Sequence, residues 1–294
     1  MSIALKSPDD LPVLYRAADA ASLSGQRRYL RTLRARLLAL LAAAVVGTVG
    51  WDLHGVSVAG IGALIAFLVA LGAGIYLATT APEKAWYEGR AAAESVKTLS
   101  WRYVARGDSF ESPLRADDDS RFIARLQEIL RDLTDVNLSA ESAGDQISEG
   151  MRTARSATFD ERKKLYLEAR IREQRNWYQQ KADWNRTRAE RWTLAAIVLE
   201  MLGVLAGVAR VFFDLDVDLL GIVAAGAASV TAWLEAKQHR NLATAYGITT
   251  QELASAASLG DGIVDEAEWA DFVGHAEEAI SREHTLWRAS RGIR

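Results

Sequence analysis

The longest uncharged segment of the chain limits its fold more than any other feature. Residues 53–82 contain no Lys, Arg, Asp or Glu, and a membrane-spanning helix needs roughly 20 apolar residues. We therefore expect one span at residues 56–80. Three weaker apolar runs predict further spans at residues 33–51, 192–213 and 217–234. The four spans would form two hairpins with short connections.

The rest of the sequence is charged and rich in helix-forming residues. Half of the residues are hydrophobic, yet the mean hydropathy is −0.02, because charged segments dilute the apolar runs. The four prolines all lie outside the apolar runs. We therefore predict an all-α membrane protein: two tandem helical hairpins with four transmembrane helices and long cytoplasmic helical extensions.

Charge placement predicts the orientation in the membrane. Basic clusters flank the outer ends of both hairpins, whereas acids occupy the two turns. By the positive-inside bias, both termini are cytoplasmic in a multi-pass protein of the cell inner (plasma) membrane. The first basic cluster is expected to bind anionic lipid headgroups. It consists of Arg27, Arg28, Arg31, Arg34 and Arg36.

The two halves of the chain repeat one another weakly. We divide the sequence into an N-terminal half at residues 1–137, a linker at 138–158 and a C-terminal half at 159–294. Each half is predicted to contain a helix, a two-span hairpin and a second helix. A short match supports a duplication, since Ala85–Glu88 follows the second span and Ala232–Glu235 closes the fourth.

Basic and aromatic residues around both hairpins resemble the SMODS- and SLOG-associating two-transmembrane effector (SLATT) family. The N-terminal half is similar to one subfamily and the C-terminal half to another. The resemblance implies a pore-forming or membrane-perturbing effector in prokaryotic defence or conflict systems, with a nucleotide or protein trigger. The residues that carry it are Leu11-Pro12, Tyr15–Asp19 and Gln26–Leu30, then Glu161-Arg162, Tyr166, Arg170-Ile171, Gln174, Trp177-Tyr178, Lys181-Ala182 and Ile280–Trp287.

Glu200 is the one acid deep inside a predicted span. It lies eight residues after Trp192, about 12 Å into the helix at 1.5 Å per residue. A carboxylate at that depth costs several kcal/mol unless it meets water, a partner or a proton. One interpretation is a cation site facing a pore. The other is a buried or protonated Glu200 that hydrogen bonds to Thr48 or Ser229.

Two further groups of residues allow two interpretations each. The acidic turn concentrates cations at a pore mouth or is a solvated turn; its residues are Asp214, Asp216 and Asp218. Small residues let helices approach closely in lipid, either inside one protomer or between subunits. The residues concerned are Gly203, Gly207 and Gly47.

The sequence contains little that points to catalysis. There is no cysteine, so a disulfide framework and a thiolate metal site are excluded. The four histidines lack metal-ligand spacing, and there is no phosphate-binding loop or paired carboxylate motif. We expect no enzyme activity, no cofactor, no metal and no nucleic-acid partner. We expect instead a homo-oligomeric membrane pore or ion channel in contact with membrane lipids; a non-conducting scaffold or sensor that recruits partners through its cytoplasmic helices is the alternative.

Overall fold

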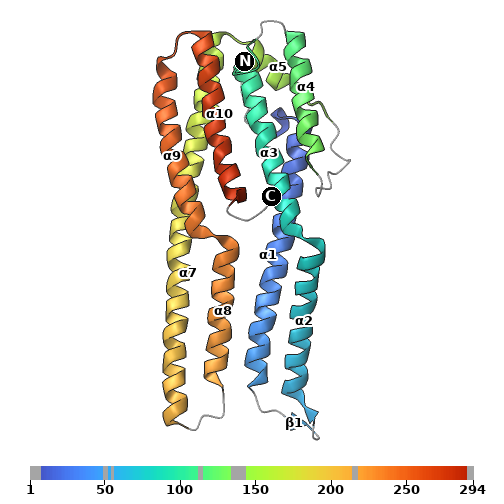
Figure 1. Ribbon diagram of the computed structural model, residues 1–294, viewed down its shortest axis with the longest axis vertical. Helices are drawn as coiled ribbons and strands as arrows, with labels where there is room; N and C mark the ends of the chain where they lie inside the picture. The colour runs from blue at the N-terminus through green and yellow to red at the C-terminus, as the bar shows by residue number, and fades with distance from the viewer. Residues whose placement is uncertain are drawn as a thin grey trace. The chain divides into compact units, whose positions relative to one another are not determined.

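Helices make up nearly all of the computed structural model (Figure 1). It describes residues 8–48, 52–53, 56–111, 115–133, 144–213 and 218–289. The all-α class predicted from the sequence is confirmed. In chain order the elements are η1 (Pro8–Asp10), α1 (Val13–Gly47), β1 (Asp52–Leu53), β2 (Val56–Ser57), α2 (Val58–Thr80), α3 (Pro82–Ala105), α4 (Arg115–Arg131), α5 (Glu149–Ser156), α6 (Phe159–Tyr166), the π-helix η2 (Leu167–Arg172), α7 (Glu173–Phe212), α8 (Leu219–Lys237), α9 (His239–Gly262) and α10 (Glu266–Ala289).

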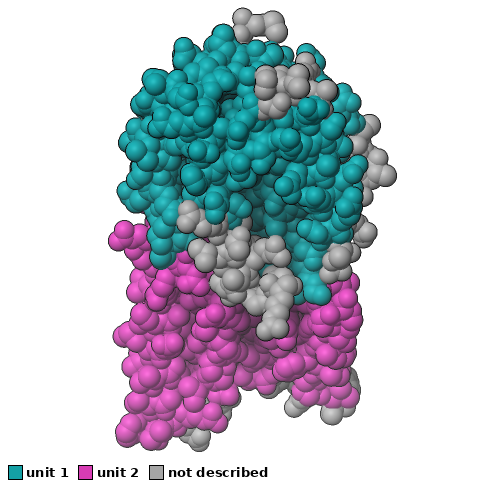
Figure 2. Space-filling model, turned by 45° about the horizontal axis from the view of Figure 1, so that its top comes forward, with its two compact units in different colours: residues 1–26, 83–182, 244–294 teal, residues 27–82, 183–243 magenta. Residues whose placement is uncertain are grey.

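The chain forms two compact units, coloured separately in Figure 2. Unit 1 comprises residues 1–26, 83–182 and 244–294, and unit 2 comprises residues 27–82 and 183–243. Each unit therefore combines segments from both halves of the sequence. The predicted division at residues 138–158 separates two halves that are each continuous in sequence, which is a different division from the two units, and it stays a prediction.

Unit 2 is built from the C-terminal part of α1, from α2, from most of α7 and from α8. Small residues bring these helices together. A Cβ atom on Gly62 of α2 would lie 2.9 Å from Val46 Cγ1 of α1. A Cβ atom on Gly226 of α8 would lie 3.8 Å from Leu199 of α7 and 4.0 Å from Leu41 of α1. Glycine thus permits the close helix contacts that membrane interiors favour.

Three helices of the described chain, rather than four, are long and apolar enough to cross a membrane. They are Val58–Thr80, Phe159–Phe212 and Leu219–Gly262, and only 11%, 6% and 11% of their apolar windows are buried inside the protein. The predicted span at residues 33–51 differs because its described part ends at residue 48 and includes Arg34 and Arg36. The outward-facing apolar surface of the other three is what a lipid environment requires.

The second helix of each hairpin ends in the same way. Ala81 and Gln238 both adopt the left-handed conformation, with φ of 37° and 49°. Their N–H groups donate to Leu77 O and Leu234 O at 3.1 Å and 2.8 Å. This shared helix end supports the repeat. The four-residue match, however, does not occupy equivalent positions in the two halves: Ala85–Glu88 lies after the helix end at Ala81, whereas Ala232–Glu235 lies before the helix end at Gln238.

Unit 1 packs the start of α1 closely against α3. A Cβ atom on Gly89 would lie 2.8 Å from Ser22 N and 2.9 Å from Ala18 O. Ser22 Oγ donates a hydrogen bond to Trp86 O at 3.0 Å. Only a residue without a side chain fits at this crossing, which places two backbones in direct contact.

Part of the predicted linker is packed structure. Ser148 caps α5: its Oγ accepts from Met151 N and donates to Asp10 O at 2.6 Å. Met151 and Arg155 are both buried. The helix at residues 149–156 therefore contributes buried side chains to the core of unit 1, in place of the open connection that small polar residues suggested.

Candidate functional site

Glu200 lies on an outward-facing, apolar surface of α7 in unit 2. Its side chain is exposed, as are Ile197, Val204, Val208 and Val211, which follow one another at helical spacing. The carboxylate forms no hydrogen bond or ion pair with any described residue. The helix therefore presents one charge within a surface that is otherwise suited to lipid.

The protomer does not bury Glu200 against the two predicted hydroxyl partners. Thr48 Oγ1 donates to Val45 O at 2.7 Å, and Ser229 Oγ donates to Ala225 O at 2.8 Å. Both hydroxyls thus bond to carbonyl groups of their own helices. The interpretation of Glu200 as a carboxyl buried against Thr48 or Ser229 is wrong for this protomer.

The acidic turn is only partly described. Asp214 and Asp216 lie outside the described residues. Asp218 caps α8, accepting from Gly221 N at 3.1 Å, and pairs with Arg210 at 2.9 Å. One of the three acids is thus already compensated by a cation and by a helix terminus.

The three predicted packing glycines have different surroundings. A Cβ atom on Gly47 would lie 3.9 Å from Ala63 of α2, and one on Gly203 would lie 3.7 Å from Val223 of α8. For a Cβ atom on Gly207, no described neighbouring atom lies within 4 Å. Gly47 and Gly203 therefore pack within the protomer, whereas Gly207 leaves open space beside α7.

The basic cluster forms an exposed stretch within the long helix α1. All five arginines of residues 27–36 are exposed. The guanidinium carbon of Arg34 lies 4.7 Å from the centre of the Trp233 ring, within cation–π range. The exposed guanidinium groups of this stretch are thus accessible to anionic headgroups.

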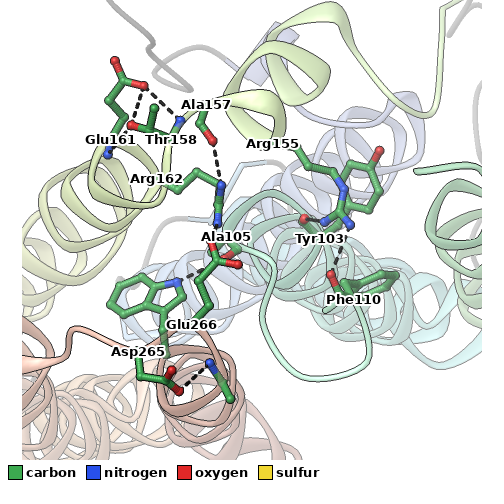
Figure 3. Close-up of polar contacts among 12 residues, drawn as sticks. Tyr103, Ala105, Phe110, Arg155, Ala157, Thr158, Glu161, Arg162, Asp265 and Glu266 are labelled. Carbon is green, nitrogen blue, oxygen red and sulfur yellow. Dashed lines mark hydrogen bonds and ion pairs between the residues drawn. The ribbon is translucent and has the colours of Figure 1, made fainter. Parts of the chain in front are cut away.

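Unit 1 contains a buried arginine that joins three elements (Figure 3). Arg155 of α5 donates to Tyr103 O and, at 3.1 Å, to Phe110 O. It also pairs with Asp118 of α4, and neither side chain is more than 5% exposed. Its guanidinium lies 4.6 Å from the Tyr103 ring centre. Arg155 therefore satisfies one carbonyl group in the last turn of α3 and one in the connection that follows it, while holding α4 and α5 together.

A second arginine connects α6 to α10 in the same view (Figure 3). Arg162 donates to Ala157 O at 2.6 Å and to Glu266 Oε1 at 2.5 Å. Nearby, the Trp269 indole N–H donates to Ala105 O at 3.0 Å. These contacts fix the start of α10 against α3 and α6.

A third buried pair lies next to the π-helical turn. Arg170 donates to Glu277 through Nε at 2.8 Å and through Nη2 at 2.6 Å, and Tyr166 Oη donates to the same carboxylate at 3.0 Å. The two charged side chains are 1% and 0% exposed. Lys97 of α3 lies close to this pair, and its burial together with the positive charge of Arg170 lowers the pKa of Lys97. Arg170 itself lies within the π-helical turn η2.

These buried ions were missed as core residues when the sequence was read by hydrophobic periodicity. The segment after Phe159 alternates basic, acidic and aromatic residues, which is typical of an exposed helix. Arg162, Tyr166, Arg170 and Tyr178 are nevertheless buried. Each of the four is among the residues that carried the family resemblance. Their recurrence at intervals of four or eight positions on a single helix face is the signal that could have identified them.

The histidines give no metal site in the part of the chain that the structure describes, where no three His, Asp or Glu side chains cluster. His239 instead has its Nδ1 atom 2.7 Å from Asn185 Oδ1, and both side chains are buried. This contact joins α7 to the start of α9.

Comparison with known families accounts for both halves of the chain. The family of SMODS and SLOG-associating 2TM effector domain 3 matches residues 12–163, and that of SMODS and SLOG-associating 2TM effector domain 1 matches residues 166–287. No curated protein and no solved structure matches the chain significantly. Such domains are effectors associated with prokaryotic conflict systems. The chain therefore belongs to the SMODS and SLOG-associating 2TM effector family and carries two of its domains in tandem.

Proposed function

We propose that this protein is a homo-oligomeric ion-conducting pore of the inner membrane in which α7 faces the conduction path. The observation that supports this proposal most is the exposed, unpartnered carboxylate of Glu200 on an apolar helix face. If that face met lipid, the carboxylate would cost several kcal/mol. Water or a bound cation in a lumen removes the cost.

Assembly is part of the proposal because a single protomer offers Glu200 no enclosed path. Copies arranged around an axis would bring several α7 faces together, forming a ring of carboxylates of the kind that cation pathways use. The open space beside Gly207, two turns further along α7, allows close approach of a neighbouring helix or of water. Cations are therefore the permeant class that we propose.

The proposed topology keeps four crossings. Although α1 carries Arg34 and Arg36, its later part packs along α2, with Val46 against Gly62. Long arginine side chains at a span end extend to the headgroup region. With basic residues at the outer ends of both hairpins and Asp218 at one turn, we propose that both termini are cytoplasmic.

In this account the effector acts by changing membrane permeability, without catalysis or a cofactor. We propose that a nucleotide or protein signal, as the family implies, acts on unit 1. The described exposed large hydrophobic residues of unit 1 are scattered over several elements. They are Leu23, Leu130, Trp177, Ile248, Leu259 and Val264. This distribution supports gating more than recruitment along a continuous apolar stripe.

The test is planar bilayer recording of the purified full chain, comparing wild type with Glu200→Gln. We expect a cation-selective current whose conductance or cation preference changes in Glu200→Gln. Glu190→Gln is the matched control: Glu190 lies ten residues earlier on α7, is exposed, and pairs with Arg186 at 3.2 Å. It should leave both properties unchanged.

Two outcomes would contradict the proposal. Identical currents in wild type and Glu200→Gln would reject Glu200 as a pore-lining residue. No wild-type current across a range of voltages and candidate nucleotides would favour the non-conducting scaffold.

A further inference from the structure

Apolar side chains from three helices line an open cavity in unit 2. Its volume is about 570 Å³, within the range of small-molecule sites, about 300–1,000 Å³. Leu37 and Leu41 of α1, Leu199 of α7, and Ile222 and Val230 of α8 are part of the lining. The cavity lies between the two hairpins, where it can take up a long apolar group.

Cationic groups lie at the edge of this cavity. Arg34 belongs to its lining and stacks on Trp233, another lining residue. Lys237 Nζ lies 5.7 Å from the centre of the same ring. Arg34 forms no ion pair with any described residue. Arg34 and Lys237 thus place positive charge beside one indole ring at the edge of the cavity, where it attracts an anion.

We propose that the cavity is a binding site for one anionic phospholipid. An acyl chain occupies the space between Leu41, Leu199 and Ile222, and the phosphate lies against Arg34 and Lys237. This arrangement matches an apolar chain to apolar walls and an anion to the cations at the rim. It differs from general attraction of headgroups to the basic cluster because it requires one defined place for the chain.

The chemistry of the lining favours a phospholipid over the other occupants. Inorganic phosphate would satisfy the cations but leave the apolar walls exposed to water. A zwitterionic lipid would fill the cavity but bring a cation close to Arg34. The Ser229 hydroxyl proton is donated to Ala225 O, so Ser229 does not donate a hydrogen bond to a ligand in the cavity.

Native mass spectrometry of the full chain in mild detergent tests the site. Phosphatidylglycerol, phosphatidylcholine with the same acyl chains, and inorganic phosphate are titrated separately. We expect phosphatidylglycerol to bind with a defined stoichiometry of one per chain, more tightly than phosphatidylcholine, and phosphate alone not to bind. Arg34→Gln should weaken phosphatidylglycerol binding about fivefold, because one cation contributes about 1 kcal/mol.

A second variant tests the cavity itself. Gly226→Leu places a side chain among lining atoms that already lie 3.8–4.0 Å from its Cβ position, and should remove the one-per-chain binding of phosphatidylglycerol. Ser229→Leu fills the same space from another position and serves if Gly226→Leu does not fold. The matched controls are Arg31→Gln, in the basic cluster but outside the lining, and Gly207→Leu, on open surface.

Three results would overturn the proposal. They are equal binding of the two phospholipids, losses in the control variants as large as those in the cavity variants, and full binding after the cavity is filled. Any of these would mean that lipids contact the whole membrane surface without a discrete site.

Discussion

Removing one side of the buried pair between Arg170 and Glu277 should strongly destabilise unit 1, and this gives a quantitative test. Glu277 accepts three hydrogen bonds, two from Arg170 and one from Tyr166. Glu277→Leu would leave the Arg170 guanidinium buried without its carboxylate. Breaking one side of such a pair costs about 3–5 kcal/mol.

That cost corresponds to a large thermal shift. Domains of about 150–250 residues lose about 2–4 °C in Tm per kcal/mol, so we expect Tm to fall by about 6–20 °C. Differential scanning fluorimetry of the full chain in one detergent measures it. Glu278→Leu is the matched control, because Glu278 follows on α10 and is exposed; its Tm should change little.

The double variant separates the ion pair from simple loss of packing. Arg170→Met combined with Glu277→Leu replaces two buried charges with apolar groups of similar size, so most of the lost stability should return. If the single variant unfolds at the wild-type Tm, or if the double variant loses the sum of both single losses, the reasoning about an uncompensated buried charge is wrong.

Three further expectations follow from other parts of the structure. An impermeant thiol reagent on whole cells should label Val56→Cys, in the exposed first turn, but not the exposed Ser258→Cys of α9; the opposite pattern would invert the proposed topology. Gly89→Ala should lower Tm, because the new Cβ atom would meet the backbone of α1 at 2.8–2.9 Å; an unchanged Tm would show that the helices separate freely. Burial and a hydrogen bond to Asp119 raise the pKa of Tyr103 from 10.0 in the unfolded chain to about 12. The Tyr103 hydroxyl therefore contributes fully to the free energy of unfolding below pH 10, and this contribution is lost as pH rises toward 12. The stability difference between wild type and Tyr103→Phe should therefore shrink over that interval in denaturant titrations, and a constant difference would contradict the assignment.

The helical class could be predicted from the sequence because its cause is local. An uncharged run longer than 20 residues and the near absence of proline from apolar segments leave few alternatives to membrane helices. The predicted helix after Phe159 also appears, running without a break into α7. Its π-helical turn at Leu167–Arg172 could not be predicted, since no Gly or Pro in the sequence marks it.

The less predictable features depend on contacts between distant residues. Neither Gly nor Pro marks the end of α8 at Gln238, so the exact position of this stop could not be predicted from the sequence. The orientation of Glu200 could not be predicted from periodicity, because residues 192–209 around it contain no other charged residue and form no distinct polar face. Arg155 lies in the segment predicted to be a linker, and the packing of α4 and α5 against α3 buries it together with Asp118.

The account depends most on the direction in which Glu200 faces in the assembled protein. An electron cryomicroscopy reconstruction of the full chain in lipid nanodiscs would show this directly. We expect several copies around one axis, with α7 lining it and Glu200 directed toward the lumen. A single protomer, or an assembly in which Glu200 faces lipid or is sealed in a dry contact between subunits, would contradict the proposed pore.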